Sequence, residues 1–296
     1  MPAAAPGPDA PAFDLQSHST YSDGALPPAE VVARAAQAGV ELLALSDHDT
    51  VEGIDEALAA AERHGIRLVT ATELSSIDGD REDLHVLGYG IEHRDTALLA
   101  RLDRWREDRA NRGWRMADAL EELGWHVDRD KLRARSDQGK PIGRPHLATA
   151  AFDHPANAQR IADEGLATFS DLLVKYLIPG APAFRRRTTP TVAEAIHAIH
   201  DAGGIAVWAH PFWDLDRPDE VLETIDRYIN DGLDGVEVFY TTFTREQTDF
   251  LARAAAERGL LTTGSADFHG PDHPHFSRFR AFDLHGHEPN LGPIAR

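Results

Sequence analysis

The chain has 296 residues, no cysteine and a formal net charge of −19 at pH 7. This length fits one large α/β domain or a barrel with an inserted module, and the lack of cysteine excludes disulfides and thiolate metal sites, so that any metal must be held by histidine or oxygen ligands. The negative charge argues against non-specific binding to duplex DNA, and we expect a cytoplasmic protein.

The first residues, Met1 to Pro11, are rich in alanine and proline and contain neither a basic stretch nor a sustained apolar run. We therefore expect neither a signal peptide nor a membrane anchor, and we expect residues 1–12 to form a disordered tail. Because no later segment approaches the length of a membrane-spanning helix, no membrane partner is expected.

Short apolar runs alternate with amphipathic helical patterns after this tail, an alternation that is typical of βα units and a parallel sheet. The expected strands of the first half are 13–16, 41–45, 67–72 and 85–89, and the expected helices are 27–38 and 54–64. The alternation returns from Thr191, with strands at 205–208, 235–239 and 260–263 and helices at 191–202, 218–231 and 245–258.

Between residues 94 and 187 the alternation lapses and helical patterns dominate, at 95–123, 146–152 and 169–177. This stretch holds 18 Lys and Arg against 14 Asp and Glu, whereas the rest of the chain holds 12 against 35. We therefore expect a discontinuous barrel, formed by residues 13–93 and 188–296, that is interrupted by a basic helical insertion at 94–187.

Histidines and carboxylates gather just after the expected strands, where the loops of a barrel or a parallel sheet converge on one active site. Residues two apart leave an extended strand on the same face, so positions 16 and 18, and likewise 267 and 269, can reach one metal together. Neutral imidazoles mixed with carboxylates suit Zn, Mn or Fe. Such ions would allow an acidic protein to bind an anionic phosphate.

These motifs resemble those of the polymerase-and-histidinol-phosphatase (PHP) family, and they span residues 14 to 269. The similarity is greatest to the branch that hydrolyses nucleotide monophosphates, nucleoside 3',5'-bisphosphates and short RNA ends. The stretches that carry it are Asp14-Leu15-Gln16-Ser17-His18-Ser19, Ser22-Asp23-Gly24, Ser46-Asp47-His48-Asp49-Thr50, Thr72-Glu73, His85-Val86-Leu87-Gly88, Ala209-His210-Pro211 and Ser265-Ala266-Asp267-Phe268-His269.

The resemblance implies a distorted (β/α)7 barrel with a helical insertion and a centre of two or three divalent ions (Mn, Fe or Zn). It assigns the ligands by position. The first metal would be held by the residue at position 16 with His18, Glu73 and Asp267; Glu73 would bridge to a second metal held by His85 and His210; Asp23, His48 and His269 would hold the third.

Gln16 is the one departure, because the resemblance implies histidine at this position. The amide oxygen can coordinate a hard cation, but it is a poorer donor to Zn, Fe or Mn than imidazole is. Three interpretations stay open: a weakened first site that still works, a natural loss that leaves a dinuclear or inactive centre, and an introduced change that traps substrate.

The insertion would supply substrate recognition. The resemblance indicates five of its residues at places where the family branch carries similar ones: Arg109, Arg112, Arg144, His146 and Lys175. Of these, we favour Arg144, His146 and Lys175 as phosphate or nucleotide contacts. Arg144 and His146 are also candidate catalytic residues, with His146 or a water molecule as the general acid. The alternative for the arginine-rich run 101–115 is a solvated helix face with ion pairs along it.

The leading hypothesis is a metal-dependent phosphoesterase that hydrolyses a phosphomonoester of a small nucleotide, either a nucleoside monophosphate or a 3',5'-bisphosphate. One alternative is a 5'-3' exoribonuclease acting on short RNA along the basic insertion. The other is a catalytically impaired protein that binds metal or nucleotide, because Gln16 has weakened the first site.

Overall fold

The computed structural model describes residues 11–137 and 142–296, which form two compact units. The first unit runs to Leu102 and resumes over Pro190–Arg296, and the second spans Asp103–Thr189. The expected disordered tail falls mostly on residues 1–10, outside the described residues. Its last two residues are hydrogen-bonded: Pro11 O accepts from Arg280 Nε at 2.7 Å, and Ala12 O accepts from Glu41 N at 2.7 Å.

The first unit is built on one seven-stranded sheet whose strands follow chain order. They are β1 (Phe13–Asp14), β2 (Leu42–Leu45), β3 (Arg67–Asp78), β4 (Arg81–Tyr89), β5 (Ile205–Trp208), β6 (Gly235–Tyr240) and β7 (Leu261–Ser265). The two edges approach each other, since Leu15 N donates to Gly264 O at 3.2 Å and His18 N donates to Phe268 O at 2.8 Å. The sheet is thus a nearly closed barrel, which confirms the expected distorted (β/α)7 fold.

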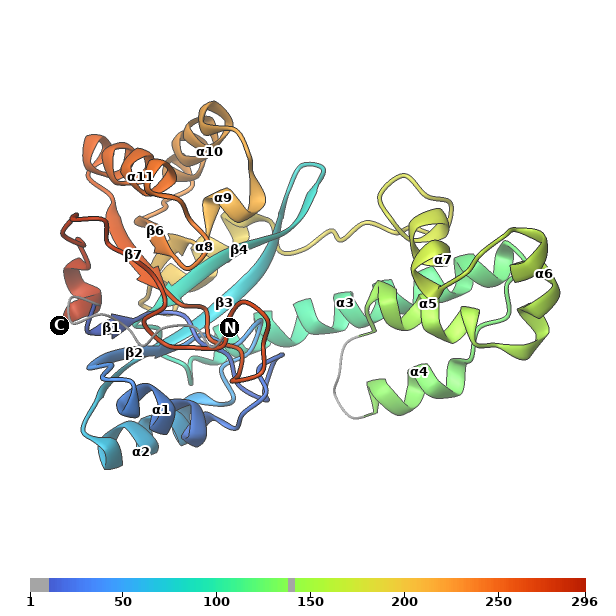
Figure 1. The fold of residues 1–296 in the computed structure, drawn as a ribbon, viewed down its shortest axis with the longest axis horizontal. Coiled ribbons are helices and arrows are strands. Elements are labelled where there is room, and N and C mark those ends of the chain that lie inside the picture. Colours follow the sequence, from blue (N-terminus) through green and yellow to red (C-terminus); the bar gives the residue numbers. More distant parts are fainter. Residues whose placement is uncertain (1–10, 138–141) are drawn as a thin grey trace. The chain divides into compact units, whose positions relative to one another are not determined.

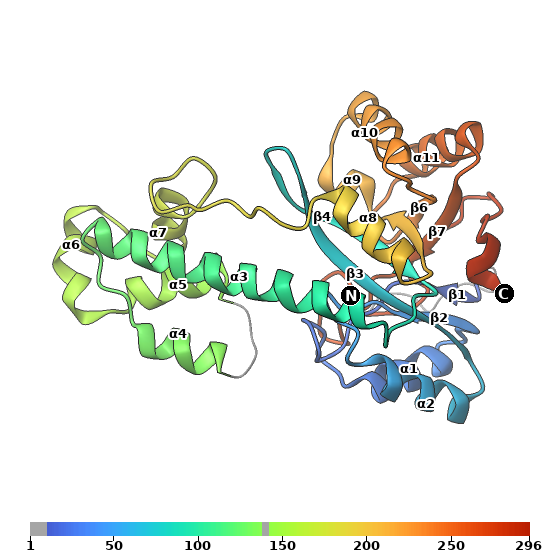
Figure 2. The same cartoon turned by 180° about the vertical axis from the view of Figure 1, so that it is seen from behind.

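Amphipathic helices cover the outside of the barrel (Figures 1 and 2). They are α1 (Pro28–Gln37), α2 (Ile54–His64), α8 (Val192–Asp201), the short α9 (Pro211–Asp214), α10 (Pro218–Asn230) and α11 (Arg245–Arg258), and a final turn η2 covers Gly292–Ala295. Helices α1 and α2 pack together next to β2 and β3, while α8 packs on β3, β4 and β5 and α11 packs on β6 and β7. Their apolar stripes supply the burial that stabilises the barrel.

The sheet is not parallel throughout, so the expectation of a parallel sheet is wrong around β4. Strands β3 and β4 form an antiparallel hairpin, and β4 also pairs antiparallel with β5. Gly79, at φ +58°, and Asp80 join the hairpin. Two residues suffice for a hairpin but are far too few for the crossover that a parallel pair needs. The register sets Glu73 opposite Leu87 and Ser75 opposite His85, so Glu73 and His85 share one face.

The second unit is entirely helical within its described residues. Helix α3 (Thr96–Glu122) leads into it, followed by α4 (Arg129–Ser136), α5 (Arg144–Phe152), η1 (Pro155–Asn157), α6 (Ala158–Asp163) and α7 (Phe169–Tyr176). Leu120, Trp125, Leu147 and Leu172 are among the side chains buried in its separate core. Nowhere in residues 11–137 and 142–296 is there a helix both long and apolar enough to cross a membrane.

Candidate metal centre

All nine predicted ligand positions lie in one contact network, at the carboxyl ends of β1, β2, β5 and β7 and within the hairpin of β3 and β4. Gln16 and His18 follow β1, His48 follows β2, Glu73 is in β3, His85 is in β4, His210 follows β5, and Asp267 and His269 follow β7; Asp23 belongs to the loop after β1. Each of the nine has a side-chain atom within 4 Å of another member. The fold therefore concentrates imidazoles and carboxylates at one point, as the motif spacing led us to expect.

Glu73 is the hub of this network. Its carboxylate is fully buried and faces four imidazoles. Oε1 lies 2.8 Å from His85 Nδ1 and 3.2 Å from His210 Nε2, while Oε2 lies 3.1 Å from His18 Nε2 and 3.6 Å from His48 Nδ1. Burial alone would raise the pKa of Glu73, but the surrounding histidines lower it well below its ordinary value. The carboxylate is therefore ionised, which is the form that could bind cations.

Asp23 forms the outer part of the network. Its carboxylate lies 3.5 Å from His269 Nε2 and 3.7 Å from both His48 Nε2 and His18 Nδ1. The three histidines outweigh burial and lower the pKa of Asp23. The Asp23 side chain is about half exposed, whereas Glu73 is inaccessible. This side of the centre is the one that opens to solvent.

Several buried atoms in the network have no partner with hydrogen-bond geometry: His18 Nε2, His48 Nδ1, His210 Nδ1 and Asp267 Oδ1, although His18 Nε2 lies 3.0 Å from Asp267 Oδ1. Leaving such groups unpaired is costly, and each needs an explanation. Within the described residues, three groups bring their ligand atoms within 4.8 Å of one another: His18, Asp23, His48 and His269; His48, Glu73 and His85; and His18, Glu73 and Asp267. A cation in these groups would supply a partner for His18 Nε2, His48 Nδ1 and Asp267 Oδ1, so the residues present fit a multinuclear metal site. His210 belongs to none of the three groups, and its Nδ1 lies 3.9 Å from Asp214.

Without cations, protons balance the negative charge of the carboxylates. Asp267 and Glu73 overcome the effect of burial and raise the pKa of His18 well above its ordinary value. Burial also lowers the pKa of His210, but Glu73 and Asp214 outweigh burial and raise this pKa to about 10. Burial, with the neighbouring His18, lowers the pKa of His48 to about 4, so His48 is neutral at pH 7 and ready to act as a ligand.

Gln16 is buried in the middle of the centre, but its amide nitrogen faces Glu73. Nε2 donates to Glu73 Oε2 at 2.9 Å, and Oε1 lies 3.2 Å from the Ser265 hydroxyl. An amide nitrogen has two N–H donors and no free lone pair for a metal. For its oxygen to replace the nitrogen at this position, the side-chain amide of Gln16 must flip. The flip would break the contacts with Glu73 and Ser265.

Two supporting residues were missed by the sequence reasoning. Glu237 in β6 accepts from His210 N at 3.0 Å and from the Ser265 hydroxyl at 2.6 Å, and Tyr240 donates its hydroxyl to Asp267 Oδ2 at 2.7 Å. Burial raises the pKa of Glu237 to about 8. The signal was a carboxylate inside the apolar run Gly235–Tyr240, since a strand buries such a residue only when it has partners.

The five predicted substrate-binding residues all lie in the second unit. Arg112 is almost fully buried, donates its Nε to Arg185 O at 2.6 Å and covers the Phe184 ring. Lys175 in α7 lies 2.9 Å from Glu164. Arg112 and Lys175 therefore have structural contacts within the insertion, and their predicted role in substrate binding stays a prediction.

The other three of the five lie on two helices of the insertion. Arg144 is the first residue of α5, and His146, in the same turn, accepts from Gly143 N at 3.1 Å through Nδ1. Burial lowers the pKa of His146, which favours the neutral ring. Arg109 lies within α3. Neither the catalytic nor the binding roles of these residues follow from these contacts alone, so they too stay predictions.

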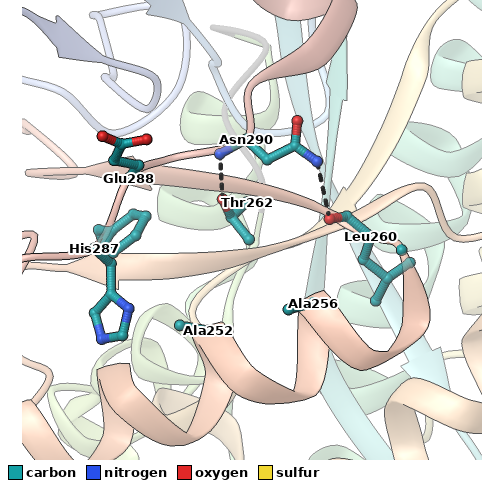
Figure 3. A pocket seen from close by; sticks show the side chains of 9 residues that line it. Ala252, Ala256, Leu260, Thr262, His287, Glu288 and Asn290 are labelled. Carbon is teal, nitrogen blue, oxygen red and sulfur yellow. Dashed lines mark hydrogen bonds between the residues drawn. The ribbon is translucent and has the colours of Figure 1, made fainter.

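A pocket elsewhere in the barrel unit is lined by residues of α11, β6 and β7 and by the segment before η2 (Figure 3). Ala252 and Ala256 face it from α11, and Asn290 borders it, with its backbone N–H bonded to Thr262 Oγ1 at 2.7 Å. None of the nine predicted ligand positions lines this pocket. It is therefore separate from the metal centre.

Comparison with known proteins agrees with this geometry. The PHP domain model matches residues 14–171. The chain is 34% identical over 288 residues to the 3',5'-nucleoside bisphosphate phosphatase of Chromobacterium violaceum, covering 96% of this chain and 94% of the relative. It is 34% identical over 263 residues to the 5'-3' exoribonuclease of Haemophilus influenzae, covering 88% and 90%. A solved structure from Bifidobacterium adolescentis, proposed to be a metal-dependent phosphoesterase, matches with a TM-score of 0.67 and 31% identity, covering 89% of each chain.

Proposed function

This chain belongs to the PHP domain family, and we propose that it hydrolyses a phosphomonoester of a small nucleotide, either a nucleoside monophosphate or a 3',5'-bisphosphate. It is a hydrolase of phosphoric ester bonds. The observation that carries the proposal is the buried Glu73 carboxylate, which has four imidazole nitrogens within 3.6 Å, beside the half-exposed Asp23.

The proposal assigns the predicted positions to two or three divalent ions (Mn, Fe or Zn). The first ion would be held by His18, Glu73 and Asp267, with Gln16 as a weak ligand. The second ion would be held by Glu73, His85 and His210, and the third by Asp23, His48 and His269. Ions bound there would act as Lewis acids, lowering the pKa of water and stabilising the oxygens of an in-line displacement at phosphorus.

The protein's own residues prepare this chemistry. Glu73 contacts four of the imidazoles directly. From outside the ligand set, Tyr240 donates a hydrogen bond to Asp267, and Glu237 accepts one from the backbone N–H of His210. Such outer contacts orient ligands and keep them from reorganising during the reaction. Because Asp23 borders solvent, we propose that the substrate phosphate enters on that side.

The substrate is a small phosphorylated compound, and a nucleotide fits the charge of the protein better than a long polyanion does. With a net charge of −19, an extended RNA would be repelled by most of the surface, whereas one phosphate group would need only the positive charge of cations bound at the centre. We propose that the insertion assists with phosphate or nucleotide contacts from Arg109, Arg112, Arg144, His146 and Lys175, of which Arg144 and His146 are also the candidate catalytic residues. The cytoplasm stays the predicted compartment.

The basic balance of residues 94–187 favours one second candidate, a 5'-3' exoribonuclease acting on short RNA. The relative from Haemophilus influenzae bears that name. In that case the insertion would guide the strand toward the centre.

One comparison of products separates the two candidates. The purified chain with added Mn is given adenosine 3',5'-bisphosphate or a 5'-phosphorylated oligoribonucleotide, and the release of phosphate and of mononucleotides is measured. We expect faster phosphate release from the bisphosphate and loss of that activity in His48→Ala. Absence of turnover on both substrates would contradict the proposal and favour the impaired binding protein.

A further inference from the structure

Trp213 is an exposed aromatic side chain close to the metal centre. Its side chain is 56% exposed, the largest exposed fraction among the large hydrophobic residues described in the barrel unit. It lies in α9, three residues after His210, and its backbone N–H donates to His210 O at 2.8 Å. A side chain of this size normally finds burial, and its indole is an amphipathic contact surface typical of binding sites.

The Trp213 ring is held in place by other aromatic rings. Its centroid lies 5.8 Å from Phe276 at 60° and 6.5 Å from Tyr240 at 71°. The contact with Phe276 is tilted and that with Tyr240 is edge-on, and together they brace the indole. Because more than half of Trp213 is still exposed, the indole offers surface on which a flat group could stack.

The same two rings connect Trp213 to the metal ligands. Tyr240 is hydrogen-bonded to Asp267, and its ring lies 5.3 Å from that of His210. Phe276 accepts from His269 N at 2.9 Å through its carbonyl, and its ring lies 5.6 Å from the His269 ring. Trp213 is thus one layer of side chains away from ligands on both sides of the centre.

The surroundings of Trp213 favour a small planar group as its binding partner. In the chain it lies between the buried Phe212 and the partly buried Asp214, followed by the charged and exposed Asp216 and Arg217. One isolated aromatic face is far smaller than the roughly 800 Å² per partner that a stable protein interface buries. It is the size of a single planar ring, and every nucleobase has such a face.

We propose that Trp213, braced by Phe276 and Tyr240, stacks on the base of a nucleotide whose phosphate lies at the metal centre. This inference rests on the proposed function and deepens it. Stacking requires a base but depends little on which base it is. The site would therefore prefer nucleotides over base-free sugar phosphates and would discriminate little among the four bases.

The kinetic test compares adenosine 3',5'-bisphosphate with its abasic analogue, which carries the same two phosphates on the same sugar. In the Mn-loaded protein we expect the KM of the abasic compound to be about tenfold higher. Trp213→Ala should bring the two KM values close together, whereas Trp213→Phe should keep most of the difference. Leu99→Ala removes another exposed apolar side chain of the barrel unit and is the matched control. Equal KM values in the unchanged protein, or a preference that survives Trp213→Ala, would overturn the inference.

A binding measurement separates failure of this inference from failure of the proposed function. A non-hydrolysable phosphonate analogue of AMP is titrated while tryptophan fluorescence is followed in the unchanged protein and in Trp213→Phe. Quenching that disappears in Trp213→Phe supports stacking even if neither bisphosphate is hydrolysed, an outcome that would refute the proposed function alone. Identical quenching in both proteins would overturn the inference, whatever the activity.

Discussion

The barrel and the insertion both contain many ionisable side chains, but they place them in different surroundings. At the barrel centre Glu73 is inaccessible to solvent, and its two carboxylate oxygens contact several imidazoles. In the insertion Lys175 is about half exposed and pairs with Glu164 at the surface. Ionisable residues thus form one buried cluster in the barrel, whereas in the insertion they form ion pairs at the surface.

This difference has an energetic consequence. Removing one partner of a buried charge network leaves the others uncompensated, which typically costs about 3–5 kcal/mol. Breaking an exposed ion pair changes stability by about 1 kcal/mol or less. Substitutions in the barrel centre should therefore have large effects on stability and metal content, and substitutions in the insertion should have small ones.

The largest effect is expected for Glu73→Gln. The neutral amide cannot bridge two cations and leaves the surrounding imidazoles without their counter-charge, so we expect a loss of bound metal and at least a 100-fold loss of phosphatase activity. Metal content by mass spectrometry and phosphate release would be measured together. Glu62→Gln, on an exposed position of α2, is the control. Full metal content in Glu73→Gln would remove Glu73 from the role of bridging ligand.

The second effect concerns pH. His210 has a pKa of about 10 in the folded protein without metal, against an ordinary value of 6.5. A raised pKa means that its stabilising contribution is complete below pH 6.5 and disappears as the pH rises toward 10. The metal-free protein should therefore lose thermal stability over this range, while its metal affinity rises because ligands must be deprotonated.

Thermal unfolding in chelator from pH 6.5 to 10 measures this loss, and His210→Gln should make the profile flatter. His64→Gln, at the exposed end of α2, is the matched control. If His210→Gln has the same slope as the unchanged protein, the charge of His210 does not stabilise the fold.

A smaller effect is expected for Glu237→Gln. The substitution preserves shape but alters the hydrogen bonds with the His210 backbone N–H and the Ser265 hydroxyl, neither of which is a predicted ligand atom. Losing such a supporting contact weakens metal affinity by about 10- to 100-fold. Competition with a chelator measures this change. Unaltered affinity would show that Glu237 is only a packing residue.

The smallest effect is expected in the insertion. Lys175→Ala should change the free energy of unfolding by less than about 1 kcal/mol, but it should raise KM without changing kcat if Lys175 binds the substrate phosphate. Lys131→Ala removes another exposed, paired lysine and serves as the control. Equal KM values for the two variants would mean that Lys175 has only its surface ion pair.

The contrast between the units also explains what the sequence could predict. Residues such as His18 and His48 are recognisable because their chemistry and their place after a strand point to the same role. The hairpin between β3 and β4 was not expected, because its polar tip around Gly79 interrupts the apolar pattern. Glu237 escaped notice because one carboxylate in an apolar run gives no indication of its partners.

In the insertion, the amino-acid composition could not distinguish residues that bind substrate from residues that stabilise the fold. Arg112 and Lys175 have the same charge, but the former is buried against Phe184 and the latter pairs at the surface. Their different contacts depend on how the helices pack, which the charge pattern does not contain. Three helices of the insertion were predictable, since those expected at 95–123, 146–152 and 169–177 agree with α3, α5 and α7 to within two residues, whereas α4 and α6 were not expected.

Gln16 carries the central claim, which is that the first metal position is the weak one. Its amide nitrogen faces Glu73, and its oxygen is a poorer ligand than an imidazole nitrogen. The direct test is to measure metal content and phosphatase activity side by side for the unchanged chain and for Gln16→His. We predict that Gln16→His binds more metal per chain and hydrolyses adenosine 3',5'-bisphosphate faster. Equal metal content and equal activity would contradict the claim that position 16 limits the centre.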